Sequence, residues 1–140
     1  MIHHRSVRAR FAAVLAVLAL VGFAAAQGLG LTFEKAAVGD TVWTGRVSGD
    51  VEGVLTTVLI SADASQPVWQ VEFYWIVTAD DPSRSFIARL TGTLNSETGA
   101  VAMSGHVVDG YREGARVEEE GMLVDAERSA FSGTITVLAN

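Results

Sequence analysis

The most regular feature of the chain is a five-residue pattern that occurs four times, each time within a stretch of alternating apolar and polar residues. Each copy has a large apolar residue, then Thr or Ser, then Gly, one variable position and an aliphatic residue. The copies are Trp43–Val47, Leu90–Leu94, Met103–Val107 and Phe131–Ile135. Side chains of a strand alternate between two faces, so the apolar residues and the glycine share one face. A glycine inside a strand is unfavourable unless the sheet bends, forms a bulge or admits a bulky neighbour, and these features curl sheets into barrels.

Eight short strands are predicted from Leu31 onward, and no stretch of that region has sustained helical periodicity. Their ranges are Leu31–Val38, Thr41–Ser48, Gly53–Ala62, Val68–Thr78, Ser85–Leu94, Ala100–Val108, Ala115–Val124 and Ala130–Leu138. The links between them are short and rich in turn-forming residues, which favours antiparallel neighbours. In the link after Leu94, Gly99 is available for a left-handed backbone conformation. Because closure removes exposed sheet edges, we predict an all-β fold: one antiparallel up-and-down β-barrel of about eight strands.

The strand Val68–Thr78 gives the clearest prediction of an inward face. Alternation places on that face Trp69, Val71, Phe73, Trp75 and Val77. An eight-stranded barrel is either filled by its own side chains or holds one small ligand.

The aromatic residues of this face are candidates for ligand binding. Trp69, Phe73 and Trp75 could contact an apolar molecule or a sugar ring through an open mouth, and core packing is the alternative. We expect the central glycines of the four repeated patterns to leave room for these rings. Those glycines are Gly45, Gly92, Gly105 and Gly133.

Residues 1–26 have the features of a secretory signal peptide. Arginines at positions 5, 8 and 10 precede an apolar run that ends in the small residues Ala24–Ala26. The run is shorter than the roughly 20 residues that span a bilayer as a helix. We therefore predict cleavage after Ala26, a β-barrel domain of residues 27–140, a secreted or periplasmic location, and membrane contact only during export.

The expected mature chain is acidic. Without the three leader arginines, the chain contains seven basic and 16 acidic residues, and Lys35 is its only lysine. This balance argues against nucleic acid or an anionic membrane surface as a partner, because both are bound through clustered Lys and Arg. The chain has no cysteine, so stability must come from packing and strand pairing rather than from disulfides.

Glu119 is the most informative candidate for chemistry. Alternation with Val117 and Gly121 turns it inward, and an apolar interior would raise the pKa of its carboxyl group. Such a group suits a general acid or base, or a polar anchor for a ligand. The alternatives are a bulge that turns Glu119 to solvent, or a neutralising partner such as Arg89 or Arg116.

Other catalytic or metal sites find little support. His106 lies opposite the apolar face of its strand, which favours a solvated histidine over a general base or ligand. One histidine and no cysteine cannot supply a usual zinc site in the expected mature chain. The acidic turn at Asp80 and Asp81 could attract calcium, but it lacks the EF-hand pattern. Ser104 and Ser132 have no partners for nucleophilic catalysis, and we expect neither a metal nor a cofactor.

The segment Leu90–Val101, continued by Ser104, Gly105, Gly110 and Gly114, resembles the glycine-punctuated strands of allene oxide cyclase-like and dirigent-like proteins. Small secreted bacterial proteins of unknown role are similar. The resemblance implies an eight-stranded barrel whose interior accepts an apolar molecule. Where such families are catalytic, they steer a reactive intermediate without a cofactor. No catalytic residue of either family matches a position here, so no site is transferred.

Three functional classes remain open. We favour a non-catalytic exported barrel that binds a small apolar molecule or a protein partner, because the pattern indicates a barrel and no catalytic constellation. The first alternative is a cofactor-free isomerase or cyclase that acts on an apolar substrate inside the barrel, with Glu119 as its polar participant. The second is a small outer-membrane barrel, although expected outward positions such as Arg46 and Arg116 are charged. A homodimer through the outer strands is compatible with each class.

Overall fold

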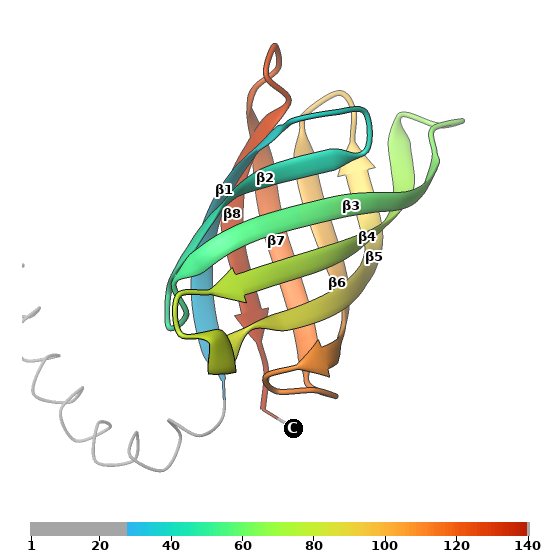
Figure 1. Cartoon of the computed structure of the whole chain (residues 1–140). Coiled ribbons are helices and arrows are strands. Elements are labelled where there is room, and N and C mark those ends of the chain that lie inside the picture. Colours follow the sequence, from blue (N-terminus) through green and yellow to red (C-terminus); the bar gives the residue numbers. More distant parts are fainter. Residues whose placement is uncertain (1–27, 140) are drawn as a thin grey trace, which may run out of the picture.

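The computed structural model describes residues 28–139, which form one closed barrel of eight antiparallel strands in chain order (Figure 1). The all-β, up-and-down prediction is therefore confirmed. The predicted signal peptide, residues 1–26, lies outside the described residues. Within residues 28–139 there is no helix long and apolar enough to cross a membrane.

Every predicted strand is present, and each end lies within two residues of its prediction. The strands are β1 (Leu29–Ala37), β2 (Val42–Gly49), β3 (Gly53–Asp63), β4 (Val68–Ala79), β5 (Phe86–Asn95), β6 (Ala100–Gly110), β7 (Arg116–Asp125) and β8 (Ala130–Val137). A 3₁₀ turn, η1 (Pro82–Arg84), links β4 to β5. It starts where the Asp81 side chain accepts a hydrogen bond from the Ser83 backbone N–H.

Pairing between β1 and β8 closes the barrel, with Phe33 opposite Gly133. The turns between strands use the expected residues. Gly99 has a φ of 83°, as predicted, and the preceding Asn95 side chain accepts hydrogen bonds from two backbone N–H groups of the loop. Short, locally specified turns of this kind fix the up-and-down order of the strands.

The mid-strand glycines let neighbouring strands approach closely. A Cβ atom on Gly45 would lie 1.8 Å from the carbonyl oxygen of Glu34, and one on Gly105 would lie 1.8 Å from that of Arg89. The groups that need the space are thus backbone atoms of the adjacent strand. This close approach agrees with the prediction that the repeated glycines serve the curling of the sheet into a barrel, and the expectation that they leave room for indole and phenyl rings stays a prediction.

The inward face predicted for β4 is confirmed. Val71, Trp75 and Val77 are buried, and Trp69 and Phe73 are partly buried against the same core. The ring of Trp75 is fully buried and meets the Phe33 ring edge-on, with centroids 5.0 Å apart. This contact belongs to the buried core of the barrel.

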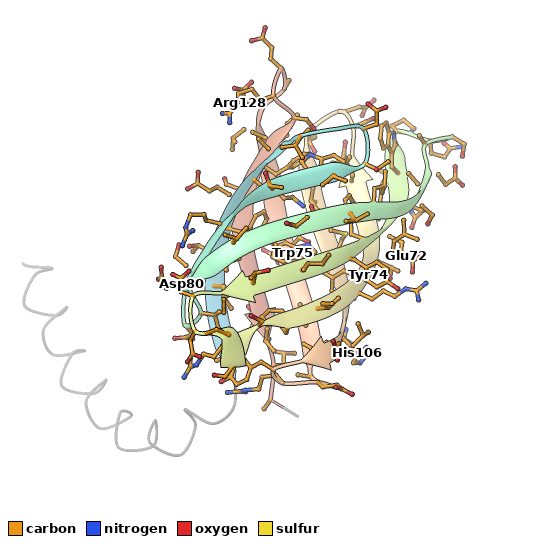
Figure 2. The ribbon with its side chains drawn as sticks, viewed as in Figure 1. Glu72, Tyr74, Trp75, Asp80, His106 and Arg128 are labelled. Carbon is orange, nitrogen blue, oxygen red and sulfur yellow. The ribbon has the colours of Figure 1, made fainter. Side chains whose placement is uncertain are left out.

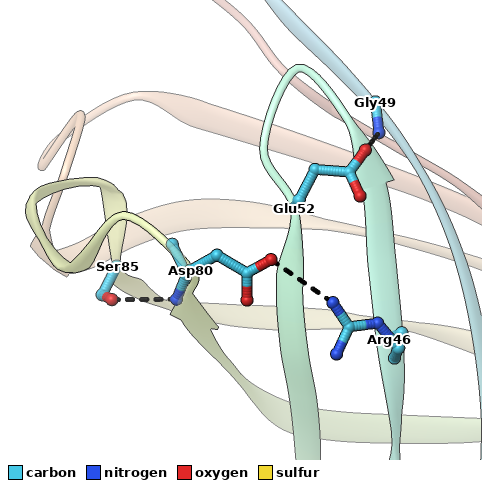
Figure 3. A network of polar contacts seen from close by, with 6 residues as sticks. Arg46, Gly49, Glu52, Asp80 and Ser85 are labelled. Atoms are coloured by element: carbon cyan, nitrogen blue, oxygen red, sulfur yellow. Dashed lines mark hydrogen bonds and ion pairs between the residues drawn. The ribbon is translucent and has the colours of Figure 1, made fainter.

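The two ends of the barrel differ. At the end that carries residues 28 and 139, the loops β2–β3, β4–β5 and β6–β7 cover the core, and Val51 and Ala115 are buried there (Figure 1). Polar contacts fix these loops from outside, including an ion pair of 3.5 Å between Arg46 and Asp80 (Figure 3). We call this the closed end. The opposite end, with loops β1–β2, β3–β4, β5–β6 and β7–β8, is the open end.

Candidate ligand-binding site

A cavity of about 390 Å³ occupies the open half of the barrel. Its walls are mainly apolar, and they come from all eight strands and from two of the four loops of the open end, β5–β6 and β7–β8. The lining residues are Lys35, Trp43, Leu59, Ala62, Trp69, Val71, Phe73, Leu94, Asn95, Ser96, Gly99, Val101, Met103, Glu119, Leu123, Ala126, Ser129 and Phe131. The volume falls within the range of roughly 300–1,000 Å³ that is typical of small-ligand sites.

The structure brings together three of the four predicted site residues. Trp69, Phe73 and Glu119 line the cavity, whereas Trp75 is fully buried and packs below it in the core. For Trp75, core packing is therefore the correct interpretation. Trp69 and Phe73 remain available to contact a molecule in the cavity, because both are only partly buried.

One wall of the mouth is fixed by a hydrogen bond between distant parts of the chain. The indole N–H of Trp43 in β2 donates to the carbonyl oxygen of Ser129 in the β7–β8 loop, at 3.0 Å. Ser129 has a φ of 48°, which is uncommon for a residue with a side chain. The Trp43 ring also packs against Phe73, with centroids 5.5 Å apart. This wall is consequently preorganised.

Lys35 lies at the deep end of the cavity, in an aromatic cage. Its side chain is 7 % exposed, and Nζ donates a hydrogen bond of 3.0 Å to the hydroxyl of Thr57. Four ring centroids surround Nζ at 5.1–5.8 Å, those of Phe33, Trp43, Phe73 and Trp75. Burial lowers the pKa of Lys35 from 10.5 to about 8, and the negative charge of Glu119 opposes that shift.

Glu119 projects into the same interior from β7. It is 3 % exposed, and burial raises the pKa of its carboxyl group from 4.5 to about 7, against the opposing effects of the Lys35 charge and the Trp75 indole. The Trp75 indole lies near enough to the carboxyl group to lower its pKa, although neither Trp75 Nε1 nor Glu119 Oε1 has a partner in good hydrogen-bond geometry. Both atoms are buried and therefore have hydrogen-bonding capacity for the polar group of a bound molecule.

Together, Lys35 and Glu119 give the cavity an amine and a carboxyl group that both titrate near neutral pH. A lysine ammonium group has three donors, of which Thr57 engages one. The pair can therefore hold the polar group of a ligand or exchange a proton with it. The two side chains come from strands that are not neighbours in the sheet, since β8 lies between β1 and β7.

The proposed arginine partners of Glu119 lie on the outer surface. Arg89 forms an ion pair with Glu72, and Arg116 pairs with Glu118 at 3.4 Å. Glu72 and Tyr74 extend outward from β4, and His106 projects from the outside of β6 (Figure 2). Among residues 28–139, no three His, Asp or Glu side chains gather in a way that could hold a metal ion.

Sequence reasoning missed Lys35 as a site residue. The sequence contains a pattern that predicts an inward Lys35, because Lys35 continues the alternation of the apolar residues Leu31 and Phe33. In the structure all three residues are buried. The same argument that turned Glu119 inward applies to Lys35. Thr57 likewise follows Leu55 on the inward face of β3 and is fully buried.

Comparison of the chain with protein-family models, with curated proteins and with solved structures found no match. The resemblance to allene oxide cyclase-like and dirigent-like proteins therefore stays a prediction.

Proposed function

We propose that this protein binds a small, largely apolar molecule in the cavity of the open end, and that Lys35 and Glu119 hold the polar group of that molecule. The observation that carries the proposal is an apolar cavity of about 390 Å³ that ends on a buried amine and a buried carboxyl group. The apolar walls supply affinity and the polar pair supplies orientation, as is usual in small-molecule sites.

The energetics of the interior support a functional role for the pair. Burying a charged lysine among aromatic rings costs stability, and an apolar residue of similar size would avoid this cost. Stability lost at one site is a common consequence of a site shaped for function. We further propose, from the leader sequence, that binding takes place in the periplasm or outside the cell.

Thermal unfolding with a panel of compounds tests the binding function. The panel should contain apolar alcohols, carboxylic acids, aldehydes and aromatic compounds of a size that fits the cavity. A ligand at about 100 times its Kd adds about 2.7 kcal/mol of stability, which raises the Tm by roughly 10 °C in a domain of this size. Native mass spectrometry should show one molecule bound per chain.

Two variants locate the binding site. Trp69→Ala removes part of the cavity wall and should weaken binding about ten-fold, because apolar contact area is lost. Tyr74→Ala changes an aromatic residue on the outer side of the same strand and should leave binding unchanged. A panel without any shift in Tm, or equal effects of the two variants, would contradict the proposal.

A second candidate function is cofactor-free isomerisation of an apolar carbonyl compound. It is favoured by the approach of the Glu119 pKa to neutrality, which suits a group that accepts and returns a proton. Deuterium uptake from D₂O next to the carbonyl of a medium-chain ketone would detect such proton transfer by NMR. Glu119→Gln should abolish the uptake, and the Tm shift that the ketone produces in this variant separates loss of proton transfer from loss of affinity. Uptake that is the same without the protein contradicts this function.

A further inference from the structure

The only lysine of the whole chain is the one inside the cavity. The other strongly basic side chains of the barrel are arginines, and Arg46, Arg89 and Arg116 are half exposed on its outer surface. Arginine keeps its proton in proteins, whereas a buried lysine can lose its proton and become a nucleophile. The chain thus places its single reactive side-chain amine where a bound molecule would meet it.

We propose that Lys35 captures carbonyl compounds, by forming a reversible imine with an apolar aldehyde bound in the cavity. This inference rests on the proposed binding function and names a ligand class for it. The geometry is favourable because Lys35 lines the cavity at its deep end and Thr57 holds Nζ through one hydrogen bond. An aldehyde that enters with its carbonyl group first would present that group to Nζ and leave its apolar chain against Trp69 and Phe73.

The environment also makes the amine available for reaction. With a pKa of about 8, about one amine in ten is neutral at pH 7, whereas an ordinary lysine has fewer than about one in a thousand. Desolvation of a lysine in an apolar pocket is an established way of activating it as a nucleophile. Glu119 supplies the acid, because its raised pKa leaves much of the carboxyl group protonated near neutral pH.

The reaction balances with the groups present. The lone pair of Nζ forms a bond to the carbonyl carbon, and the carbonyl oxygen takes a proton from the Glu119 carboxyl group while the nitrogen returns one to it. The product is a carbinolamine. Glu119 then protonates the hydroxyl group, the C–O bond breaks and water leaves. The nitrogen lone pair completes the C=N bond, which leaves a protonated imine with the Glu119 carboxylate as its counter-ion.

Reductive trapping tests this proposal. The protein is incubated with octanal at about pH 7.5, where amine and carboxylic acid coexist, and treated with sodium cyanoborohydride. Intact mass and peptide mapping should find one reduced adduct, on the peptide that contains Lys35. Because the chain has no other lysine, the N-terminal amine is the main competing site, and the peptide map distinguishes the two.

Matched variants distinguish a reaction that depends on the cavity around Lys35 from the general reactivity of any lysine amine. Lys35→Arg keeps the positive charge and should lose the adduct on that peptide. Thr32→Lys adds an amine on the exposed side of the same strand, opposite Ser48 and Thr134, and should react at least about ten times more slowly than Lys35. Glu119→Gln should slow trapping at Lys35 about ten-fold or more, and octanol should compete with octanal.

The outcomes distinguish this inference from the binding function. If octanal raises the Tm but leaves Lys35 unmodified, binding stands and imine formation is wrong. If Thr32→Lys reacts as fast at its new position as at Lys35, the adduct reflects general amine reactivity and the inference is also wrong. If neither octanal nor any other compound of the panel binds or reacts, both proposals fail.

Discussion

The closed and open halves of the barrel share the same alternation of inward and outward side chains, but their inward side chains serve different purposes. In the closed half, residues such as Val47, Phe86 and Val137 belong to the core cluster and are almost fully buried. In the open half, residues such as Trp69, Phe73 and Phe131 are only partly buried, because they face a cavity. The difference predicts that stability is concentrated in the closed half of the barrel, which leaves the open half available for the proposed ligand.

Truncating one phenylalanine in each half should give the largest and most unequal effects. Phe86→Ala removes a side chain that is 2 % exposed at the closed end, and should cost about 3–5 kcal/mol of unfolding free energy. Phe131→Ala enlarges an existing cavity and should cost about 1–2 kcal/mol. Urea denaturation of both variants checks the contrast.

Ligand binding should show the reverse order for the same pair. Phe131→Ala should weaken binding in the cavity, whereas Phe86→Ala should bind normally at temperatures where it stays folded. Equal losses of stability in the two variants would mean that the open half is packed as tightly as the closed half, and the distinction between them would fail.

The fold could be predicted from the sequence because its signals are local. Strands are predicted from alternation within one segment, and turns from the residues of one loop. Alternation within β7 likewise predicted that the Glu119 side chain points inward. The partner of Glu119 could not be identified in this way, because β1 and β7 are not sheet neighbours and their contact depends on how the barrel closes. The close backbone contacts at Gly45 and Gly105 could not be predicted for a related reason, since they depend on how neighbouring strands coil around each other.

Lys35→Met should stabilise the protein, because it removes a buried charge at the boundary between the two halves. At about pH 6 Glu119 is mostly protonated, so the variant leaves no unpaired buried charge, and a gain of about 2–3 kcal/mol is expected. Thr32→Met, on the outer face of the same strand, is the control and should change stability by less than about 0.5 kcal/mol. A destabilised Lys35→Met in urea denaturation would show that the aromatic cage requires the ammonium group.

The pH dependence of stability should report Glu119. Its pKa is raised in the folded state from 4.5 to about 7, so the folded protein holds a proton that the unfolded chain has released in this window. The stability due to this group is therefore complete below pH 4.5 and is lost as the pH rises to about 7. Lys35 stays largely protonated throughout, because its pKa is about 8.

Glu119→Gln should remove this loss. As the pH rises from 4.5 to about 7, the unfolding free energy of the variant should increase by about 2 kcal/mol relative to that of the unmodified protein. Urea denaturation at several pH values measures this difference. Glu118→Gln changes the neighbouring, exposed carboxylate and serves as the control. Parallel pH profiles for the unmodified protein and Glu119→Gln would mean that the Glu119 carboxyl group titrates normally and is not desolvated.

The smallest effect is expected for the ion pair on the outside of the closed end. Arg46 and Asp80 are 55 % and 65 % exposed, and solvent screens their attraction (Figure 3). Arg46→Gln should therefore cost less than about 1 kcal/mol, and a double-mutant cycle with Asp80→Asn should give a coupling energy that salt reduces further. Ligand binding should be unaffected, since Arg46 is not part of the cavity wall. A coupling energy well above 1 kcal/mol would assign the stability of the closed end to surface charges rather than to the apolar residues beneath them.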